Sequence, residues 1–243
     1  MKVVILAGGR GSRFGEETKH RPKPLVSVGE RPILWHVLMF YAVAGYRDFI
    51  VATGYCGDMV REYLTALAAG PPEGPVDPGS LHIEVVDTGV STPTGGRLRR
   101  IEPLLGRERF MLTWADGLAD VNIRALEEFH AGHGRLATVT AAHPPPRFGR
   151  LALEGDRVVH YAEKPPNRFE WISGGFFVLE PRVLDYIASD ETDWEREPLE
   201  RLAADGQLMA FRHEGFWQCM DVASERDHLD RLWRQGAAPW KKW

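Results

Sequence analysis

The chain has 243 residues, of which 44% are hydrophobic, so it is long enough to bury one sizeable α/β core. Its net charge of -4 lacks the basic footprint of nucleic-acid-binding proteins, so an anionic substrate would need a locally basic pocket. No apolar stretch approaches the length of a membrane span, and two cysteines, Cys56 and Cys219, cannot form a disulfide framework. We therefore predict one cytoplasmic domain over residues 1–243 that binds neither nucleic acid nor membranes.

The first half of the chain alternates strand and helix patterns. Lys2–Leu6 is an apolar run that ends in a glycine turn, which is typical of a buried parallel strand. Pro32–Ala44 is predicted as a helix because Pro32 suits the first helical position and Gly45 suits the end. A strand over Phe49–Thr53, helical spacing from residue 59 to 67 and a proline-rich loop over Gly70–Ser80 follow.

The second half continues the alternation and then changes. Strands are predicted over Leu81–Val86, Phe110–Trp114 and Ala137–Ala142, and helices over Leu98–Leu105 and Ile123–Gly132. Three short strands then suggest an antiparallel patch attached to the sheet, over Arg150–Leu153, Val158–Glu163 and Gly175–Leu179. The chain closes with helices over Arg196–Ala204 and Glu225–Gln235 and an aromatic, basic tail over Pro239–Trp243.

This order of elements predicts an α/β fold of Rossmann-like type. Alternating strands and helices favour a mostly parallel sheet that helices cover on both faces. In such sheets the ligand crevice lies at the carboxyl ends of the strands. The loops that follow Leu6, Val86 and Trp114 are therefore expected to meet at one edge.

The glycine turn Gly8–Arg13 suggests a phosphate site. Glycines after a strand let backbone N–H groups approach a phosphate closely. The turn matches neither the dinucleotide fingerprint nor the Walker pattern, because Phe14 stands where the former needs glycine and no Gly-Lys-Ser/Thr follows. Arg13 and Lys23, which is stiffened by Pro22 and Pro24, suit a triphosphate. The alternative is a tight turn followed by solvated basic residues.

These residues resemble the signature of the nucleotidyltransferases that activate sugar 1-phosphates, and the resemblance extends along essentially the whole chain. Within that family the motifs are similar to those of the glucose-1-phosphate cytidylyltransferases. The motifs are Leu6–Arg13, Lys23-Pro24, Glu16–Thr18, Pro32–His36, Asp87–Gly89, Thr94–Leu98, Asp116–Asp120, Glu163–Pro165, Gly174–Phe177, Trp194–Leu199 and Phe216–Gln218. The resemblance implies the fold of the nucleotide-diphospho-sugar transferases, with a small antiparallel sugar-binding patch.

Two aspartates are the candidate ligands of Mg²⁺. Asp116 follows a strand end, where a carboxylate points into the crevice, although an Asx turn before Gly117 would also explain it. Asp221 would be an ordinary helix-opening aspartate without the resemblance, which implies that both aspartates share the ion. Asp120 is predicted instead to be the N-cap of the next helix.

The resemblance also assigns residues to the substrates. Arg13 and Lys23 are the implied catalytic cations, on the leaving pyrophosphate and the α-phosphate. Glu163 would accept hydrogen bonds from sugar hydroxyls and Lys164 would contact the sugar phosphate, although a surface ion pair is the simpler reading of both. The other substrate-binding residues that it implies are Leu6, Ala7, Gly8, Gly9, Arg10, Gly11 and Ser12 at the phosphates, Thr92, Gly96 and Arg97 at the nucleotide, and Ala115, Gly174 and Gly175 at the sugar.

The implied reaction is transfer of a nucleotidyl group from CTP to α-D-glucose 1-phosphate, with Mg²⁺ as cofactor. Ala115 and Ser12 depart from the family, where glycine and threonine are usual, and the loop Gly70–Ser80 is shorter. Other bases (dTTP, UTP or GTP), a modified sugar phosphate, and a non-catalytic regulatory homologue therefore remain open alternatives. The resemblance also suggests a homo-oligomer, with which an exposed aromatic tail would be compatible.

Overall fold

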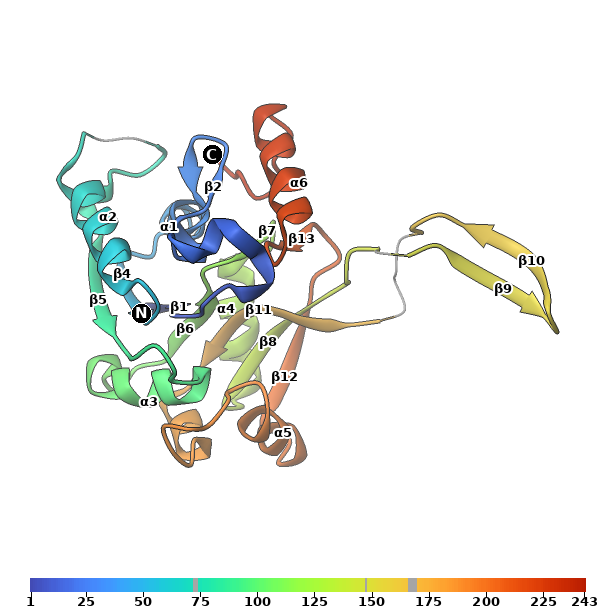
Figure 1. The fold of residues 1–243 in the computed structure, drawn as a ribbon. Coiled ribbons are helices and arrows are strands. Elements are labelled where there is room, and N and C mark those ends of the chain that lie inside the picture. The colour runs from blue at the N-terminus through green and yellow to red at the C-terminus, as the bar shows by residue number, and fades with distance from the viewer. Residues whose placement is uncertain (72–73, 147, 166–169) are drawn as a thin grey trace.

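The computed structural model describes residues 1–71, 74–146, 148–165 and 170–243, and a seven-stranded sheet lies at its centre (Figure 1). The strand order is β12-β8-β11-β6-β1-β4-β5. The bounds are β1 Lys2–Ala7, β4 Asp48–Thr53, β5 His82–Asp87, β6 Phe110–Trp114, β8 Ala137–Ala142, β11 Ile172–Leu179 and β12 Leu208–Arg212.

Helices cover both faces of this sheet, because successive side chains of a strand point to opposite faces. In β1, Val3 and Ile5 belong to one buried core, and Val4 and Leu6 belong to the other. Helices α1, α2, α4 and α6 contribute to the first core, and α3 and α5 to the second. Their bounds are α1 Ile33–Val43, α2 Gly57–Ala69, α3 Thr94–Leu105, α4 Ile123–His133, α5 Glu197–Ala204 and α6 Ala223–Arg234.

The sheet is parallel except around β11, which runs antiparallel to both of its neighbours, β6 and β8. The predicted mostly parallel fold is therefore confirmed. The three strands of the predicted antiparallel patch do not form one unit. The third, β11, belongs to the main sheet, while β9 (Arg150–Glu154) and β10 (Arg157–Ala162) form a separate hairpin. Short elements complete the fold: β2 Ser27–Val28 pairs with β3 Arg31–Pro32, β7 Gly117–Ala119 pairs with β13 Trp217–Cys219, and 3₁₀ turns cover Ser12–Lys19, Lys23–Leu25, Pro78–Ser80 and Pro181–Tyr186.

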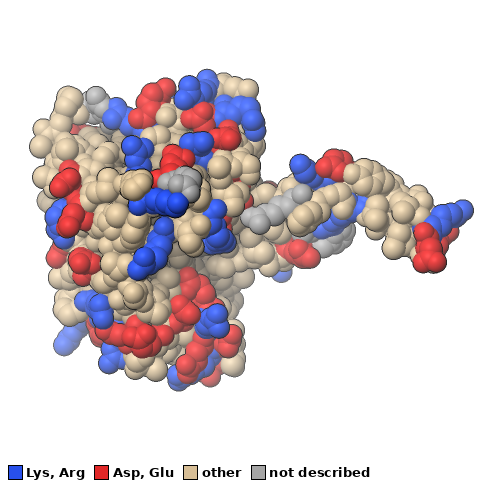
Figure 2. All heavy atoms as spheres, in the orientation of Figure 1, with Lys and Arg blue, Asp and Glu red and all other residues tan. Residues whose placement is uncertain are grey.

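The β9–β10 hairpin projects away from the body of the protein (Figure 1). Charged side chains cluster at its tip, and much of the surface behind the tip is uncharged (Figure 2). In the part of the chain that the structure describes, no helix is both long enough and apolar enough to span a bilayer.

The C-terminal tail is packed into the body, so the prediction of an exposed aromatic tail is wrong. Trp240 is fully buried and stacks on Phe216, with ring centroids 5.6 Å apart. Its indole N–H donates to Nδ1 of His36 over 3.4 Å. The aromatic residues that end the chain therefore close a core beside α1 and α6.

His36 is expected to make the protein sensitive to mild acid. It is fully buried, its Nε2 lies 2.8 Å from the carbonyl oxygen of Val28, and burial lowers its pKa from 6.5 to about 4. Because the unfolded chain binds a proton between those two values and the folded chain does not, stability is lost as the pH falls through this window. Between about pH 7 and about pH 5 this one group should cost about 2 kcal/mol of unfolding free energy.

Urea denaturation of His36→Gln measures this contribution, because glutamine can donate to Val28 and accept from Trp240 without titrating. The variant should lose less stability than the wild type over the same change in pH. An equal loss in both proteins would assign the acid sensitivity to other groups.

Candidate active site

The glycine turn after β1 is shaped by backbone conformation and by one buried hydroxyl. Gly11 has φ 62°, a left-handed conformation that favours glycine. The Thr18 hydroxyl donates to the carbonyl of Gly11 over 2.9 Å, and the Phe14 amide donates to the same oxygen. The side chains of Leu6 and Ala7 are buried in the sheet, so they can offer a ligand only their backbone. Beyond them, Gly9, Arg10, Ser12 and Arg13 are exposed.

Arg97 lies beneath this turn and holds three strand ends together. Its guanidinium donates to the carbonyl of Gly8 at the end of β1, to the carbonyl of Thr53 at the end of β4 and to the hydroxyl of Thr88 beyond β5. Only 4% of Arg97 is exposed. A Cβ on Gly8 would lie 2.0 Å from Arg97 Nη1, so a glycine is needed there. The structure thus gives Arg97 backbone and hydroxyl partners around the expected phosphate site.

Thr92 and Gly96 lie near Arg97, where the loop after β5 enters α3. Thr92 is half-buried, and Gly96 is buried against the segment that precedes α5. The Gly96 amide donates to the carbonyl of Thr192 over 3.1 Å. A Cβ on Gly96 would lie 2.0 Å from the backbone oxygen of Asp190. The absence of a side chain at Gly96 is therefore required by packing.

Asp116 and Asp221 meet, although neither lies near the other in the sequence. The Asp116 carboxylate follows β6, and the amide of Ala115 donates to Leu6 beside it in β1. The Asp221 carboxylate follows β13, which pairs with β7 directly after Asp116. The Lys23 ammonium bridges the pair, at 2.6 Å from Asp116 Oδ2 and 2.7 Å from Asp221 Oδ1.

Arg13 completes this charged cluster. Its guanidinium lies 2.9 Å from Asp221 Oδ2, and 74% of its side chain is exposed, compared with 11% for Lys23. Arg13 can therefore turn towards a ligand outside the cluster, whereas Lys23 is held inside it. Arg13, Lys23, Asp116 and Asp221 are thus brought together beside the glycine turn.

Burial and nearby charges set the charge states of Lys23 and Cys219. Burial alone would lower the pKa of Lys23, but the charges of Asp116 and Asp221 and their hydrogen bonds outweigh it and raise that pKa above 10.5. Burial raises the pKa of the Cys219 thiol to about 12, and the nearby charges of Glu225 and Asp221 add to it. Lys23 is therefore a cation at neutral pH, and Cys219 is a neutral thiol.

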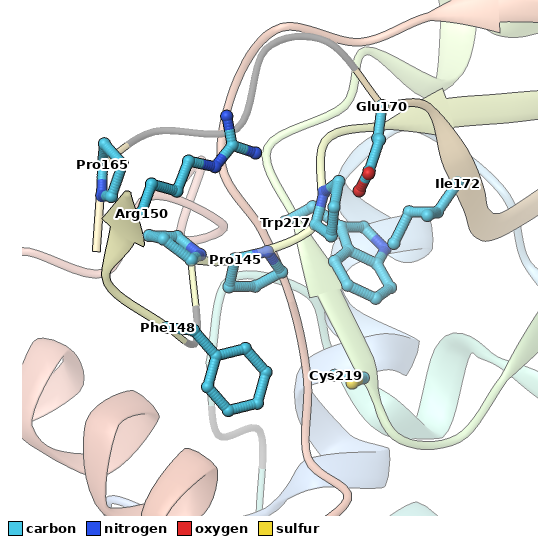
Figure 3. Close-up of a pocket in the computed structure, with 10 residues that line it drawn as sticks. Pro145, Phe148, Arg150, Pro165, Glu170, Ile172, Trp217 and Cys219 are labelled. Atoms are coloured by element: carbon cyan, nitrogen blue, oxygen red, sulfur yellow. The ribbon is translucent and has the colours of Figure 1, made fainter. Parts of the chain in front are cut away.

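A cavity of about 440 Å³ is lined by residues of β9, β11 and β13 (Figure 3). Cys219 lines it, and its Sγ is 3.9 Å from Asp221 Oδ2. Trp217 forms another part of the wall, and its indole N–H donates to the carbonyl of Gly174 over 2.7 Å. The remaining lining residues are Pro144, Pro145, Pro146, Phe148, Arg150, Pro165, Glu170 and Ile172.

Four of the residues assigned to the sugar form two groups, one in β11 and one directly after β10. Gly174 and Gly175 belong to β11, where the register with β8 shifts between Ser173 and Phe177, and Gly175 has φ 75°. Glu163 and Lys164 are exposed, and they follow β10 directly, just before the cavity-lining Pro165. The Glu163 carboxylate accepts a hydrogen bond from the Tyr161 hydroxyl.

Several residues that support the site were assigned no role from the sequence, although Thr18 and Thr88 lie within its motifs. Thr18 shapes the glycine turn, and Thr53 and Thr88 accept from Arg97. Glu225 accepts from the backbone amide of Asp221 over 2.6 Å, which fixes the start of α6. A glutamate three residues into a helix was the available signal for this cap. The motifs Glu16–Thr18 and Asp87–Gly89 include two of the threonines, but nothing in them indicates which groups these hydroxyls bind.

Asp120 is not the N-cap of α4, so that prediction is wrong. The N-cap is Asn122, whose side chain accepts from the Ala125 amide over 3.0 Å. Asp120 Oδ1 instead accepts from the amide of Phe216 over 2.7 Å. The Asp120 carboxylate therefore binds the residue that precedes β13 and does not cap the helix.

The chain matches a known protein family over most of its length. The family described as nucleotidyl transferase matches residues 2–227. The chain belongs to the nucleotidyl transferase family. It is 45% identical to the glucose-1-phosphate cytidylyltransferase of Salmonella typhi, and the match covers 100% of both chains.

Solved structures carry the same fold at low sequence identity. HddC from Yersinia pseudotuberculosis superposes with a TM-score of 0.74 at 18% identity, covering 96% of this chain and 99% of that one. A UDP-glucose pyrophosphorylase complexed with UDP-glucose gives a TM-score of 0.73 at 16% identity, covering 97% of this chain and 98% of that one. The resemblance of the motifs to this family, and the nucleotide-diphospho-sugar transferase fold that it implies, are confirmed.

Proposed function

We propose that this nucleotidyl transferase joins CTP to α-D-glucose 1-phosphate, giving CDP-glucose and pyrophosphate. The full-length relative at 45% identity is named for that reaction. The observation that carries the proposal is the position of the Lys23 ammonium, which touches one oxygen of Asp116 and one of Asp221. Two distant carboxylates thus face one cation position beside a glycine turn, which is the arrangement that a phosphate-bound metal needs.

The same two carboxylates suit Mg²⁺. Carboxylate oxygens are its preferred ligands, and it is usually held by one or two of them together with substrate phosphates and water. The position of the Lys23 ammonium between Asp116 and Asp221 agrees with this preference, because it shows that the two carboxylates can share one positive group. When bound, Mg²⁺ would neutralise negative charge on the reacting phosphates.

The protein's own residues would position the reactants. The backbone amides of the Gly8–Ser12 turn would hold the triphosphate, and Arg13 would stabilise the pyrophosphate as it leaves. Lys23 would neutralise charge on the α-phosphate. An oxygen of the sugar phosphate bonds to the α-phosphorus while the bond from that phosphorus to the β-phosphate oxygen breaks. The nucleophile is already an anion, so neither a general base nor a covalent enzyme intermediate is required.

The cavity lined by β9, β11 and β13 would receive the sugar phosphate. Its wall combines Trp217 and a run of prolines, which present flat apolar surfaces, with Arg150 and Glu170, which present charge. Ala115 follows β6, Gly174 and Gly175 belong to β11, and Glu163 and Lys164 directly precede Pro165 of the cavity wall. We propose that these residues contact the sugar hydroxyls and the sugar phosphate.

Pyrophosphate release tests the substrate assignment. CTP, dTTP, UTP and GTP would each be supplied with glucose 1-phosphate, mannose 1-phosphate or galactose 1-phosphate. The expected result is the highest kcat/KM for CTP with glucose 1-phosphate. A preference for another pair would reject the substrates but keep the reaction. Nucleotide binding with no pyrophosphate release from any pair would reject the enzyme and favour a regulatory role.

A homo-oligomer is proposed on the basis of the β9–β10 hairpin. Cross-strand pairing puts Leu151 opposite Tyr161 and Leu153 opposite Val158, so these four side chains share one face. Each of them is more than half exposed. A two-stranded hairpin is at best marginally stable alone, so this apolar face needs a cover. The hairpin's two arginines and two acidic residues cancel, which disfavours nucleic acid or charged lipid and favours a second copy of the chain.

Light scattering with size-exclusion chromatography tests this interface. The double variant Leu151→Glu, Leu153→Glu is expected to convert the oligomer into monomers, because four buried carboxylates in a two-fold contact would be unpaired. Ala152→Glu lies on the opposite face of the same strand and should leave the oligomer intact. A monomeric wild type, or an oligomer that survives the double variant, would reject the hairpin as the interface.

The two thiols, Cys56 and Cys219, are both free. Free thiols are consistent with the reducing cytoplasm, which we propose as the enzyme's compartment.

A further inference from the structure

The spacing of Asp116 and Asp221 depends on a very short antiparallel ladder. Strand β7 starts directly after Asp116, and β13 ends two residues before Asp221. Only three residue pairs join the strands, with Cys219 opposite Gly117 at one end and Trp217 opposite Ala119 at the other. A ribbon of this length is not stable by itself, so its ends must be fastened.

Both ends of this ladder are fastened by hydrogen bonds. At the end nearer the cluster, the Met220 amide donates to the carbonyl of Asp116 over 2.8 Å. At the far end, the Asp120 amide donates to the carbonyl of Phe216 over 3.1 Å, and the Phe216 amide donates back to Asp120 Oδ1 over 2.7 Å. Asp120 therefore holds Phe216 through its main chain and its side chain at once.

The Asp120 carboxylate also ties the far end of the ladder to the rest of the protein. The His213 Nε2 is 3.0 Å from Asp120 Oδ1, and the His213 amide donates to the carbonyl of Ala141 in β8 of the central sheet. The Lys242 ammonium, in the packed C-terminal tail, is 3.6 Å from Asp120 Oδ2. A Cβ on Gly215 would lie 2.3 Å from Asp120 Oδ1, so the chain is built to bring that carboxylate close.

We infer that Asp120 is a positioning residue, which fixes the register of the β7/β13 ladder and thereby the separation of Asp116 and Asp221. It does not touch either carboxylate, so its effect reaches the site through the backbone of two strands. The inference rests on the proposed function, because the separation matters only if the two aspartates share an ion. Partners that orient metal ligands typically change metal affinity by about 10-fold to 100-fold when they are removed.

Calorimetric titration with CTP, in Mg²⁺ and in EDTA and without sugar phosphate, tests this inference without turnover. The ratio of the two CTP dissociation constants is the metal-dependent gain in affinity. Asp120→Ala is expected to reduce that gain by about 10-fold while the CTP affinity in EDTA stays at the wild-type value. Asp120→Asn keeps an oxygen that accepts from Phe216 and should restore most of the gain. A merely structural defect would weaken both affinities together.

Two further variants make the test decisive. Asn122→Ala removes a hydrogen bond of similar kind two residues away, at the N-cap of α4, and should leave the gain unchanged. Gly215→Ala pushes a methyl group against Asp120 Oδ1 and should reproduce the loss if Asp120→Ala folds poorly. Thermal unfolding would show that each variant used is folded.

The possible failures are distinguishable. If the wild type shows no gain beyond that of Asp221→Asn, the shared metal site itself is rejected. If the wild type shows the gain, and folded Asp120→Ala or Gly215→Ala retains all of it, the shared site stands and the role of Asp120 is rejected.

Discussion

Lys23→Ala and Asp221→Asn are each expected to reduce kcat by about 10²-fold to 10³-fold or more, because the first removes a preorganised cation from the reacting phosphates and the second removes a charged ligand of the proposed Mg²⁺. Lys23 contacts both carboxylates, and Asp221 contacts Lys23 and Arg13. The loss should therefore appear mainly in kcat, because both residues are proposed to act on the phosphate groups whose charge shifts during the reaction. Steady-state pyrophosphate release at saturating CTP and glucose 1-phosphate measures it.

Matched controls separate this loss from damage to the fold. Asp227→Asn makes the same chemical change in α6, where 59% of the side chain is exposed, and should retain wild-type turnover. Lys23→Met preserves most of the volume of the buried side chain, so it should remain folded, although less stable without the bridge between the two carboxylates, and should be inactive. Near-normal turnover in folded Lys23→Met or in Asp221→Asn would remove these residues from the chemistry.

Gly96→Ala is expected to destabilise the protein by about 3 kcal/mol or more, because overpacking against backbone cannot be relieved by a rotamer change. The new methyl group would lie 2.0 Å from the backbone oxygen of Asp190 and 2.8 Å from the Thr92 side chain. To make room, the start of α3 must move away from the segment before α5. Because Arg97 is the next residue, its guanidinium and the hydrogen bond that it donates to Gly8 would move with the start of α3.

Urea denaturation measures this effect against a glycine that has room. Gly132 lies inside α4 with no atom within 4 Å of an added Cβ. Gly132→Ala should therefore stabilise the protein by about 0.5–1 kcal/mol through helix propensity. The packing explanation fails if Gly96→Ala unfolds at the wild-type urea concentration. Nucleotide binding would then be the remaining reason for a glycine at this position.

Local patterns in the sequence predicted most of the fold. The strand Lys2–Leu6 was predicted from its apolar run and the helix Pro32–Ala44 from its flanking proline and glycine, and the structure has β1 at Lys2–Ala7 and α1 at Ile33–Val43. These features are set by neighbours within a few residues, so a single sequence carries them. The hairpin was also visible as two short strands, but its separation from β11 was not, because β11 could pair with either set of strands.

The sequence by itself determined the glycine turn, the two cations near it and the strand end that carries Asp116, since each follows from spacing along the chain. Only the tertiary structure decided that Asp221 joins Asp116, that Asp120 fastens the ladder between them and that Arg97 holds three strand ends from below. The tertiary structure also buries Trp240 of the aromatic tail in the core. The physical reason is the same in each instance: a hydrogen bond or an ion pair between residues far apart in the chain leaves no periodic trace, because its partner is selected by packing in three dimensions.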